Sequence, residues 1–103
     1  MAITNVELIT VASNIYVSSG NTVVSVMYFC NTSTTAKNLN LYLLPSGNDT
    51  ANVAHQIYKD VQIAANDTFV VDMEKLVLAN GDQIRANVSA NSAVTSTVSF
   101  IGI

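Results

Sequence analysis

The run of sequence that decides the fold is Thr22-Val23-Val24-Ser25-Val26-Met27-Tyr28-Phe29-Cys30. Because successive side chains of a β-strand point to opposite faces of a sheet, a strand over this run is apolar on both faces. One face would carry Val24, Val26, Tyr28 and Cys30, and the other Val23, Met27 and Phe29. Such a strand is either central to a hydrophobic core or covered by another subunit.

Shorter runs with the same period-two alternation flank this one on both sides. Turn-forming Asn, Ser, Gly and Asp residues separate them about every ten residues, a spacing typical of sandwich and jelly-roll strands. We expect strands over residues 3–11, 15–17, 38–43, 53–63, 69–71, 76–78, 84–88 and 93–103. Residues 72–79 could instead hold one helical turn capped by Asp72.

Two further features of the pattern concern its interruptions. The in-facing side chains of run 53–63 are predicted to be Val53, His55, Ile57, Val61 and Ile63. Lys59 falls on the same side, so a bend or bulge is expected near Lys59-Asp60. The strongest turn signal is Asn80-Gly81-Asp82.

The composition of the 103 residues agrees with an all-β fold. Half of the residues are hydrophobic and only 11% are charged, while polarity comes from 12 Asn, 10 Ser and 10 Thr residues. These side chains compete with the helical backbone for hydrogen bonds, and Thr and Val favour a pleated surface. We therefore expect residues 1–103 to form a single-domain antiparallel β-sandwich, either immunoglobulin-like or a jelly roll.

The charge and the cysteine content argue against nucleic-acid-binding proteins and against secreted proteins stabilised by disulfides. A net charge of -3 lacks the basic footprint of a nucleic-acid-binding protein. The single cysteine, Cys30, cannot form an intramolecular disulfide, and neither a secretion signal nor a run long enough to cross a bilayer is recognisable. We expect a soluble, unprocessed protein that binds neither nucleic acid nor membranes.

Residues for catalysis or metal binding are scarce. His55 is the only histidine, and we interpret it as a half-buried strand residue or an interface contact; Cys30 is interpreted as a small buried hydrophobe. One histidine and one cysteine cannot make a structural zinc site, and the dispersed aspartates form no calcium-loop motif. We predict no catalytic residue, no metal site, no cofactor and no enzymatic activity.

Two sets of polar and aromatic residues are open to a sugar-related interpretation. Four Asn-x-Ser/Thr glycosylation motifs, at Asn31, Asn48, Asn66 and Asn87, are explained by the abundance of these residue types. Tyr42 and Tyr58 are predicted to face outward, where they could stack on a carbohydrate; packing on the strands is the alternative.

Two segments resemble small all-β virion proteins of tailed phages, particularly those of cyanobacterial and other environmental phages. They are residues 31–47, NTSTTAKNLNLYLLPSG, and residues 76–86, LVLANGDQIRA, the latter followed by Ala93-Val94 and a closing strand. The second segment also resembles the hairpin of jelly-roll domains such as the tumour-necrosis-factor and C1q-like families. Residues 1–30 resemble the phage proteins only in being strand-like.

The resemblance implies a virion structural protein without catalytic residues, assembled in the host cytoplasm. We expect a capsid decoration (cement) protein that binds the major capsid protein or other virion proteins on the outer shell, as a homo-oligomer that we predict to be a trimer. The alternatives are a neck, tail or baseplate accessory protein and a carbohydrate-binding module. The predicted subunit or capsid interface consists of Val23, Met27, Phe29, Phe100, Ile101 and Ile103. The particle contact is expected at residues 2–11 or 100–103.

Overall fold

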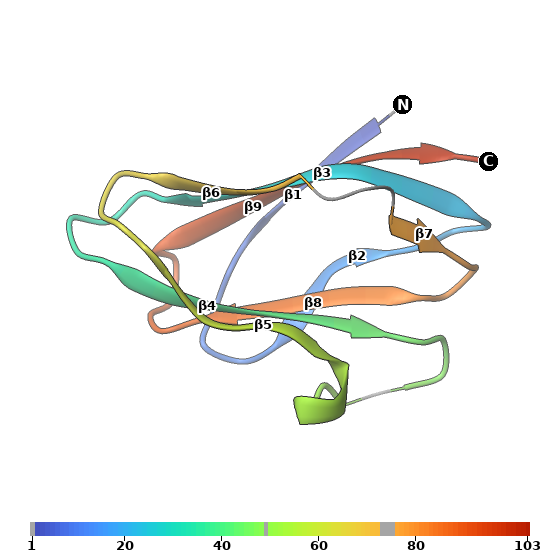
Figure 1. The fold of residues 1–103 in the computed structure, drawn as a ribbon, viewed down its shortest axis with the longest axis horizontal. Coiled ribbons are helices and arrows are strands. Elements are labelled where there is room, and N and C mark those ends of the chain that lie inside the picture. Colours follow the sequence, from blue (N-terminus) through green and yellow to red (C-terminus); the bar gives the residue numbers. More distant parts are fainter. Residues whose placement is uncertain (1, 49, 73–75) are drawn as a thin grey trace.

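The computed structural model describes residues 2–48, 50–72 and 76–103, and in them the chain forms two antiparallel β-sheets packed face to face (Figure 1). The described strands are β1 (Ala2–Glu7), β2 (Ser13–Val17), β3 (Thr22–Asn31), β4 (Lys37–Leu44), β5 (Gln56–Ile63), β6 (Thr68–Val71), β7 (Leu76–Leu78), β8 (Gln83–Val88) and β9 (Val94–Gly102). The expected all-β sandwich is confirmed. Each expected run contains a strand, with ends that differ by a few residues.

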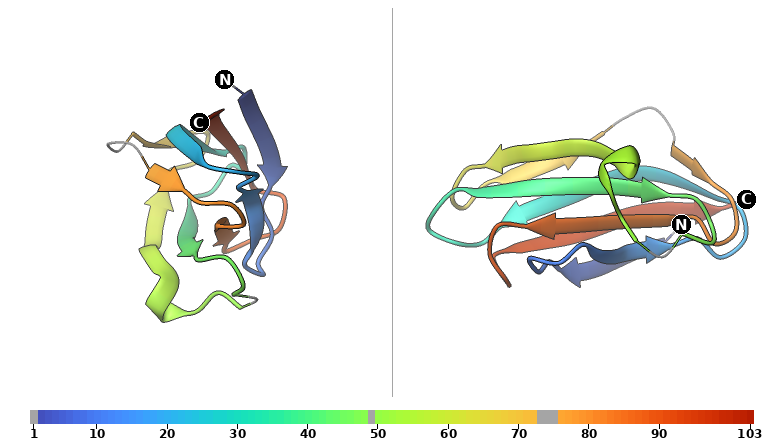
Figure 2. Two further views of the ribbon diagram at one scale, coloured as in Figure 1. Left: turned by 90° about the vertical axis from the view of Figure 1, so that its right-hand side faces the viewer. Right: turned by 90° about the horizontal axis from the view of Figure 1, so that it is seen from below.

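The order of the strands identifies the sandwich as a jelly roll. Sheet A has the order β1-β9-β3-β6, with β7 also paired to β3, and sheet B has the order β2-β8-β4-β5. Early strands thus pair with late ones: β1 with β9, β2 with β8, β3 with β6 and β7, and β4 with β5. The chain thus forms a long antiparallel hairpin that is rolled up so that β3 pairs with β9 and β4 pairs with β8. This strand order is that of a jelly roll and differs from the strand order of immunoglobulin sheets. Figure 2 shows the two layers from two other directions.

A β-bulge at Ser25 changes the direction of the side chains of β3. Val24 pairs with Phe100 and Val26 with Ser99, so Ser25 is an extra residue without a counterpart on β9. Val24 therefore faces the core together with Met27 and Phe29. The predicted division of the run is wrong, because strict alternation assigned Val24 and Phe29 to opposite faces.

A β-bulge also changes the direction of the side chains in β5, and the bulge predicted near Lys59-Asp60 is confirmed. Asp60 has a φ of 50°, and the register with β4 shifts between Leu39 and Leu41. Tyr58, before the bulge, consequently shares the inner face with Val61 beyond it. The predicted in-facing position of Ile57 is wrong, since its side chain is exposed.

The start of the run 53–63 is not a strand. Val53–His55 forms a short 3-10 helix, because the side chain of Asn52 accepts a hydrogen bond from the backbone N–H of Ala54 at 2.9 Å. Val53 is exposed as a result, contrary to its predicted place in the core. In the other uncertain segment, residues 76–78 form β7, and residues 73–75 of the alternative helical turn lie outside the described residues.

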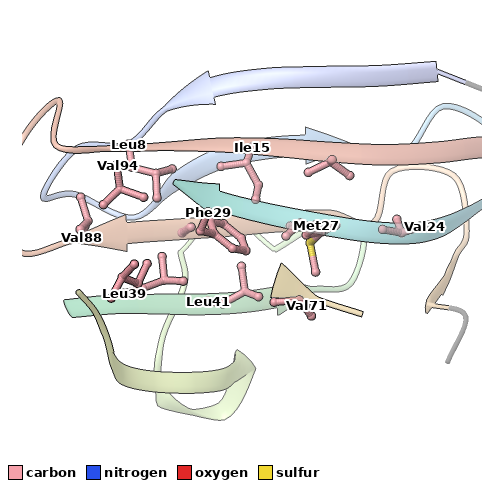
Figure 3. Packing of buried hydrophobic residues seen from close by; sticks show 14 of the residues in the cluster. Leu8, Ile15, Val24, Met27, Phe29, Leu39, Leu41, Val71, Val88 and Val94 are labelled. Atoms are coloured by element: carbon pink, nitrogen blue, oxygen red, sulfur yellow. The ribbon is translucent and has the colours of Figure 1, made fainter. Parts of the chain in front are cut away.

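The hydrophobic core fills the space between the two sheets (Figure 3). Phe29 and Met27 of β3 extend from sheet A toward Leu39 and Leu41 of sheet B, and all four are at most 1% exposed. The core is completed by Leu8, Ile15, Val24, Ile63, Val71, Leu78, Ile84, Ala86, Val88, Ala93, Val94 and Val98.

Asn31 is a fully buried polar residue that ties one end of the sandwich together. Its Nδ2 donates to the backbone carbonyls of Thr35 at 3.0 Å, Ile63 at 3.0 Å and Ala64 at 3.2 Å. Its Oδ1 accepts from the backbone N–H and the hydroxyl of Ser33, at 3.0 and 2.7 Å. Asn31 thereby links the turn after β3 to the turn after β5, and its glycosylation motif is inaccessible in the folded protein.

Replacement of Asn31 by alanine is expected to destabilise the protein by about 3 kcal/mol, because the carbonyl of Ile63 loses its buried side-chain donor and those of Thr35 and Ala64 each lose one of two donors. The free energy of unfolding can be measured by urea denaturation followed by circular dichroism. Asn38→Ala, at an exposed position of β4, is the matched control and should change stability by less than about 0.5 kcal/mol. Equal losses for the two variants would contradict the linking role of Asn31.

Candidate functional site

The outer faces of the two sheets differ in their chemistry. Of all residues in the strands of sheet A, Glu7 alone is charged. The strands of sheet B carry four charged residues, Lys37, Lys59, Asp60 and Arg85. One surface of the sandwich is therefore nearly uncharged, and the other is polar.

Apolar side chains gather on the outer face of sheet A because the strand registers bring them together. Val23 lies opposite Val77 on one side and Ile101 on the other, which makes a row across β7, β3 and β9. A second row contains Tyr28 and Val70. With the exposed Ile3 of β1, these residues define what we call the apolar face: Ile3, Val23, Tyr28, Val70, Val77 and Ile101.

Two pairs of polar side chains on this face bond to each other. The hydroxyl of Thr97 donates to Oδ1 of Asn5 at 2.8 Å. The hydroxyl of Ser25 lies 3.1 Å from both the backbone oxygen and the hydroxyl of Ser99. Because these groups already have partners, covering the face with another protein would leave few polar groups unsatisfied.

The predicted interface residues are divided between this face and the interior. Val23 and Ile101 lie side by side on the apolar face, and Ile103 is exposed beyond the end of β9. Met27 and Phe29 are buried between the sheets and present no surface to a partner, which corrects their predicted position. Phe100 is half-buried and packs on Tyr16, with ring centroids 4.5 Å apart.

Four residues of the apolar face were not among the predicted interface residues: Ile3, Tyr28, Val70 and Val77. Their runs are recognisable as strands, but the sequence does not say which strands are neighbours. The rows across the sheet depend on pairings between segments that are far apart in the chain. Alternation could not have assigned Val70 and Val77 to an outer face, because residues 69–71 and 76–78 are apolar at every position.

The outer face of sheet B is lined with amide side chains. A row across the sheet contains Gln56, Tyr42, Arg85 and Asn14. Arg85 donates to Oδ1 of Asn14 at 2.9 Å and to Oε1 of Gln83 at 2.8 Å. Tyr42 is half-buried in this row, so its predicted location on an outer face agrees with the register.

Tyr58 does not face outward as predicted. It pairs with the buried Leu41 and packs against the core, and its ring contacts Phe69 edge-on at a centroid distance of 5.7 Å. The bulge at Asp60 turns it inward. A carbohydrate platform that combines Tyr42 with Tyr58 is therefore not present.

The two residues considered for nucleophilic chemistry lie on different parts of the molecule. His55 uses Nδ1 to accept a hydrogen bond from the backbone N–H of Asn52 at 3.3 Å, as part of the capping box of the 3-10 helix. It is thus neither a strand residue nor in the core. Cys30 is half-buried and points to the outer face of sheet A, which corrects its predicted burial in the core.

No cluster of three or more metal-ligating side chains occurs in residues 2–48, 50–72 and 76–103. Asp49, one of the dispersed aspartates, lies outside the described residues. Asp82 is engaged in the fold, since its carboxylate accepts from the backbone N–H groups of Ser46 at 3.0 Å and Ala79 at 2.9 Å. These two bonds tie the turn before β8 to the turn after β4.

A cleft of about 220 Å³ opens at one end of the sandwich, beside Asp82. Aliphatic side chains of β4 and β7 make up most of its lining, and both oxygens of Asp82 are occupied by backbone donors. The cleft therefore holds no pair of free polar groups that could act as acid and base.

The part of the chain that the structure describes has no helix long and apolar enough to cross a membrane. The arrangement as a whole is that of a jelly-roll domain whose most distinctive surface is an apolar sheet face. Comparisons of the chain with protein-family models, with curated proteins and with solved structures find no match.

Replacement of Tyr58 by alanine is expected to destabilise the protein by about 3 kcal/mol, because it removes a ring packed on the core and its contact with Phe69. Tyr42→Ala, on the outer face of sheet B, should lower the free energy of unfolding by about 1 kcal/mol or less. Urea denaturation of both variants measures the difference. A larger loss for Tyr42→Ala would show that the inward position of Tyr58 is wrong.

Proposed function

We propose that this chain is a structural protein of a phage particle, a capsid decoration protein that binds the outer shell. The observation that carries the proposal is the exposed apolar surface of the domain, which extends from the apolar face to Ile103 beyond the end of β9. The described residues form no cluster of three or more metal-ligating side chains. Such a surface acts by binding, since large exposed apolar patches mark interaction sites. The resemblance of residues 31–47 and 76–86 to virion proteins directs the proposal to phage particles.

The jelly-roll fold is compatible with this role by analogy. Viral capsid domains use this architecture, and lectins use it as well, so the fold supports the particle hypothesis without deciding between the two. The dominance of neutral Asn, Ser and Thr over charged side chains suits a protein displayed in many copies.

We assign the particle contact to the two ends of the described chain, which form one surface. Ala2 pairs with Phe100 in the register of β1 and β9, so the start of segment 2–11 and segment 100–103 meet at the same end of sheet A (Figure 2). Ile103 is 72% exposed there, beyond the end of β9 and outside the apolar face. Buried against a capsid subunit, its side chain would add apolar area to the contact.

A neck, tail or baseplate location would use the same surfaces and differ only in the number of copies. The carbohydrate-binding alternative rests on the amide row of sheet B and on Tyr42. It is disfavoured because Tyr58 is turned inward and because the amide oxygens of Asn14 and Gln83 already accept hydrogen bonds from Arg85.

The copy number in purified virus particles tests the proposal. Quantitative mass spectrometry, normalised to the major capsid protein, should find hundreds of copies of this chain per particle. A handful to a few dozen copies would contradict a shell location and assign the protein to the neck, tail or baseplate. Complete absence from the particles would refute the virion role and leave the carbohydrate-binding alternative.

Binding of the purified protein to undecorated particles is expected to depend weakly on salt. The proposed contact consists of apolar and neutral groups, whereas ion pairs at a surface are screened by added salt. Cosedimentation at low salt and at about 0.5 M salt should give dissociation constants within about threefold of each other. Ile103→Asp should weaken binding at both concentrations, and loss of binding by salt alone would contradict the assignment.

A further inference from the structure

We propose that the outer face of sheet A packs against the same face of a second copy of this chain, in a two-fold symmetric dimer rather than the trimer expected from the resemblance. The inference concerns the protein in solution and does not rest on the proposed function. Its basis is the distribution of apolar, polar and charged side chains over the described surface.

Exposed large apolar side chains are concentrated on this face. Ile3, Tyr28, Val70, Val77 and Ile101 are 42% to 64% exposed and occupy all strand positions of sheet A. The other exposed large apolar residues form no row on a sheet: Ile9 and Val11 lie between β1 and β2, Val17 on β2, Val53 in the 3-10 helix, Ile57 on β5 and Ile103 beyond β9. The apolar face is therefore the one sheet surface of the described chain on which these residues form rows.

Electrostatics favours contact between copies through this face. Each chain has a net charge of -3, so two copies repel each other when acidic surfaces approach. The strands of sheet A contribute one acidic residue, Glu7, which lies at the end of the edge strand β1 and away from the row of Val77, Val23 and Ile101. Two copies that meet through the row of Val77, Val23 and Ile101 bring no charged residue of these strands into the centre of the contact.

Two pairs of polar side chains on the face are compatible with its burial. Thr97 is bonded to Asn5 and Ser25 to Ser99, so these side chains can leave water with their partners already in place. Tyr28 adds an aromatic ring to the apolar area that a contact would bury.

The size and shape of the face fit a second copy. Four strand positions about 4.8 Å apart and a length of about 30 Å along β3 give a flat area of roughly 600 Å², close to the ~800 Å² per partner of a stable interface. Two copies of one sheet have the same twist and can stack in an aligned sheet-on-sheet packing about 10 Å apart. A two-fold axis through the face pairs the same patch on both subunits.

The oligomeric state of the purified full chain tests the inference, measured by native mass spectrometry and by light scattering after size exclusion. The wild-type protein should be a dimer. Val77→Asp and Val70→Asp place a charge at two positions of the face, on β7 and β6, and each should raise the dimer dissociation constant at least a hundredfold. Val17→Asp is the matched control, since Val17 is a 47% exposed valine of sheet B; it should remain dimeric.

Urea denaturation shows whether each variant is folded, and two variants are used so that misfolding of one leaves a valid test. A wild-type protein that is monomeric at about 100 µM, or that forms a trimer, would overturn the inference. Dissociation by Val17→Asp, or retention of the dimer by both face variants, would also overturn it. The solution measurement contains no virus particles, so it tests the dimer independently of the proposed function. If the protein is a dimer in solution but is absent from virus particles, the proposed function is refuted and the dimer is not.

Discussion

The extra residue in β3 is the constraint on which the rest of the structure depends. β3 pairs with β9 along one edge and with β6 and β7 along the other. The direction of its side chains therefore determines which side chains of these three strands point into the core. The bulge at Ser25 lets Thr22 and Val24 face inward before it, and Met27, Phe29 and Asn31 after it. Since paired residues share a face, this single insertion selects which side chains fill the core and which form the apolar face.

Alternation in the sequence is enough to locate the strands, and it indicates the all-β class. Alternation does not predict which side chains point into the core beyond a bulge, because one added residue moves every later side chain of the strand to the opposite face. Met27, Phe29 and Tyr58 were misplaced for that reason, although the bulge near Lys59-Asp60 was itself recognisable from a charge on the apolar side. The 3-10 helix at Val53–His55 was missed because the short-range cap by Asn52 outweighed an apparent strand pattern. Rows such as Val77, Val23 and Ile101 could not be predicted, since they depend on pairings of distant strands.

The outer faces of the two sheets are suited to different environments, one to contact with protein and the other to contact with water. Sheet A offers a nearly uncharged, apolar surface on which Thr97 bonds to Asn5 and Ser25 to Ser99, and it is suited to permanent contact with protein. Sheet B offers amides and a guanidinium that already bond to one another, a surface that stays hydrated at little cost. In an assembly built through sheet A, sheet B would be turned toward solvent, and the amide row with Tyr42 would be the part seen from outside.

The pairing of β1 with β9 also has a consequence for synthesis of the protein. The hydroxyl of Ser96 donates to the backbone oxygen of Val6, 90 positions earlier in the chain. While the chain grows on the ribosome, β1 has no strand to pair with until β9 emerges. β3 likewise lacks β9, the strand with which it forms its longest pairing. Contacts over such separations slow folding, and unpaired, uncharged strands associate readily with other chains. Sheet A is thus completed only after most of the chain has been made, and nascent chains that lie close together on one messenger RNA compete with β9 for the open edges of β1 and β3.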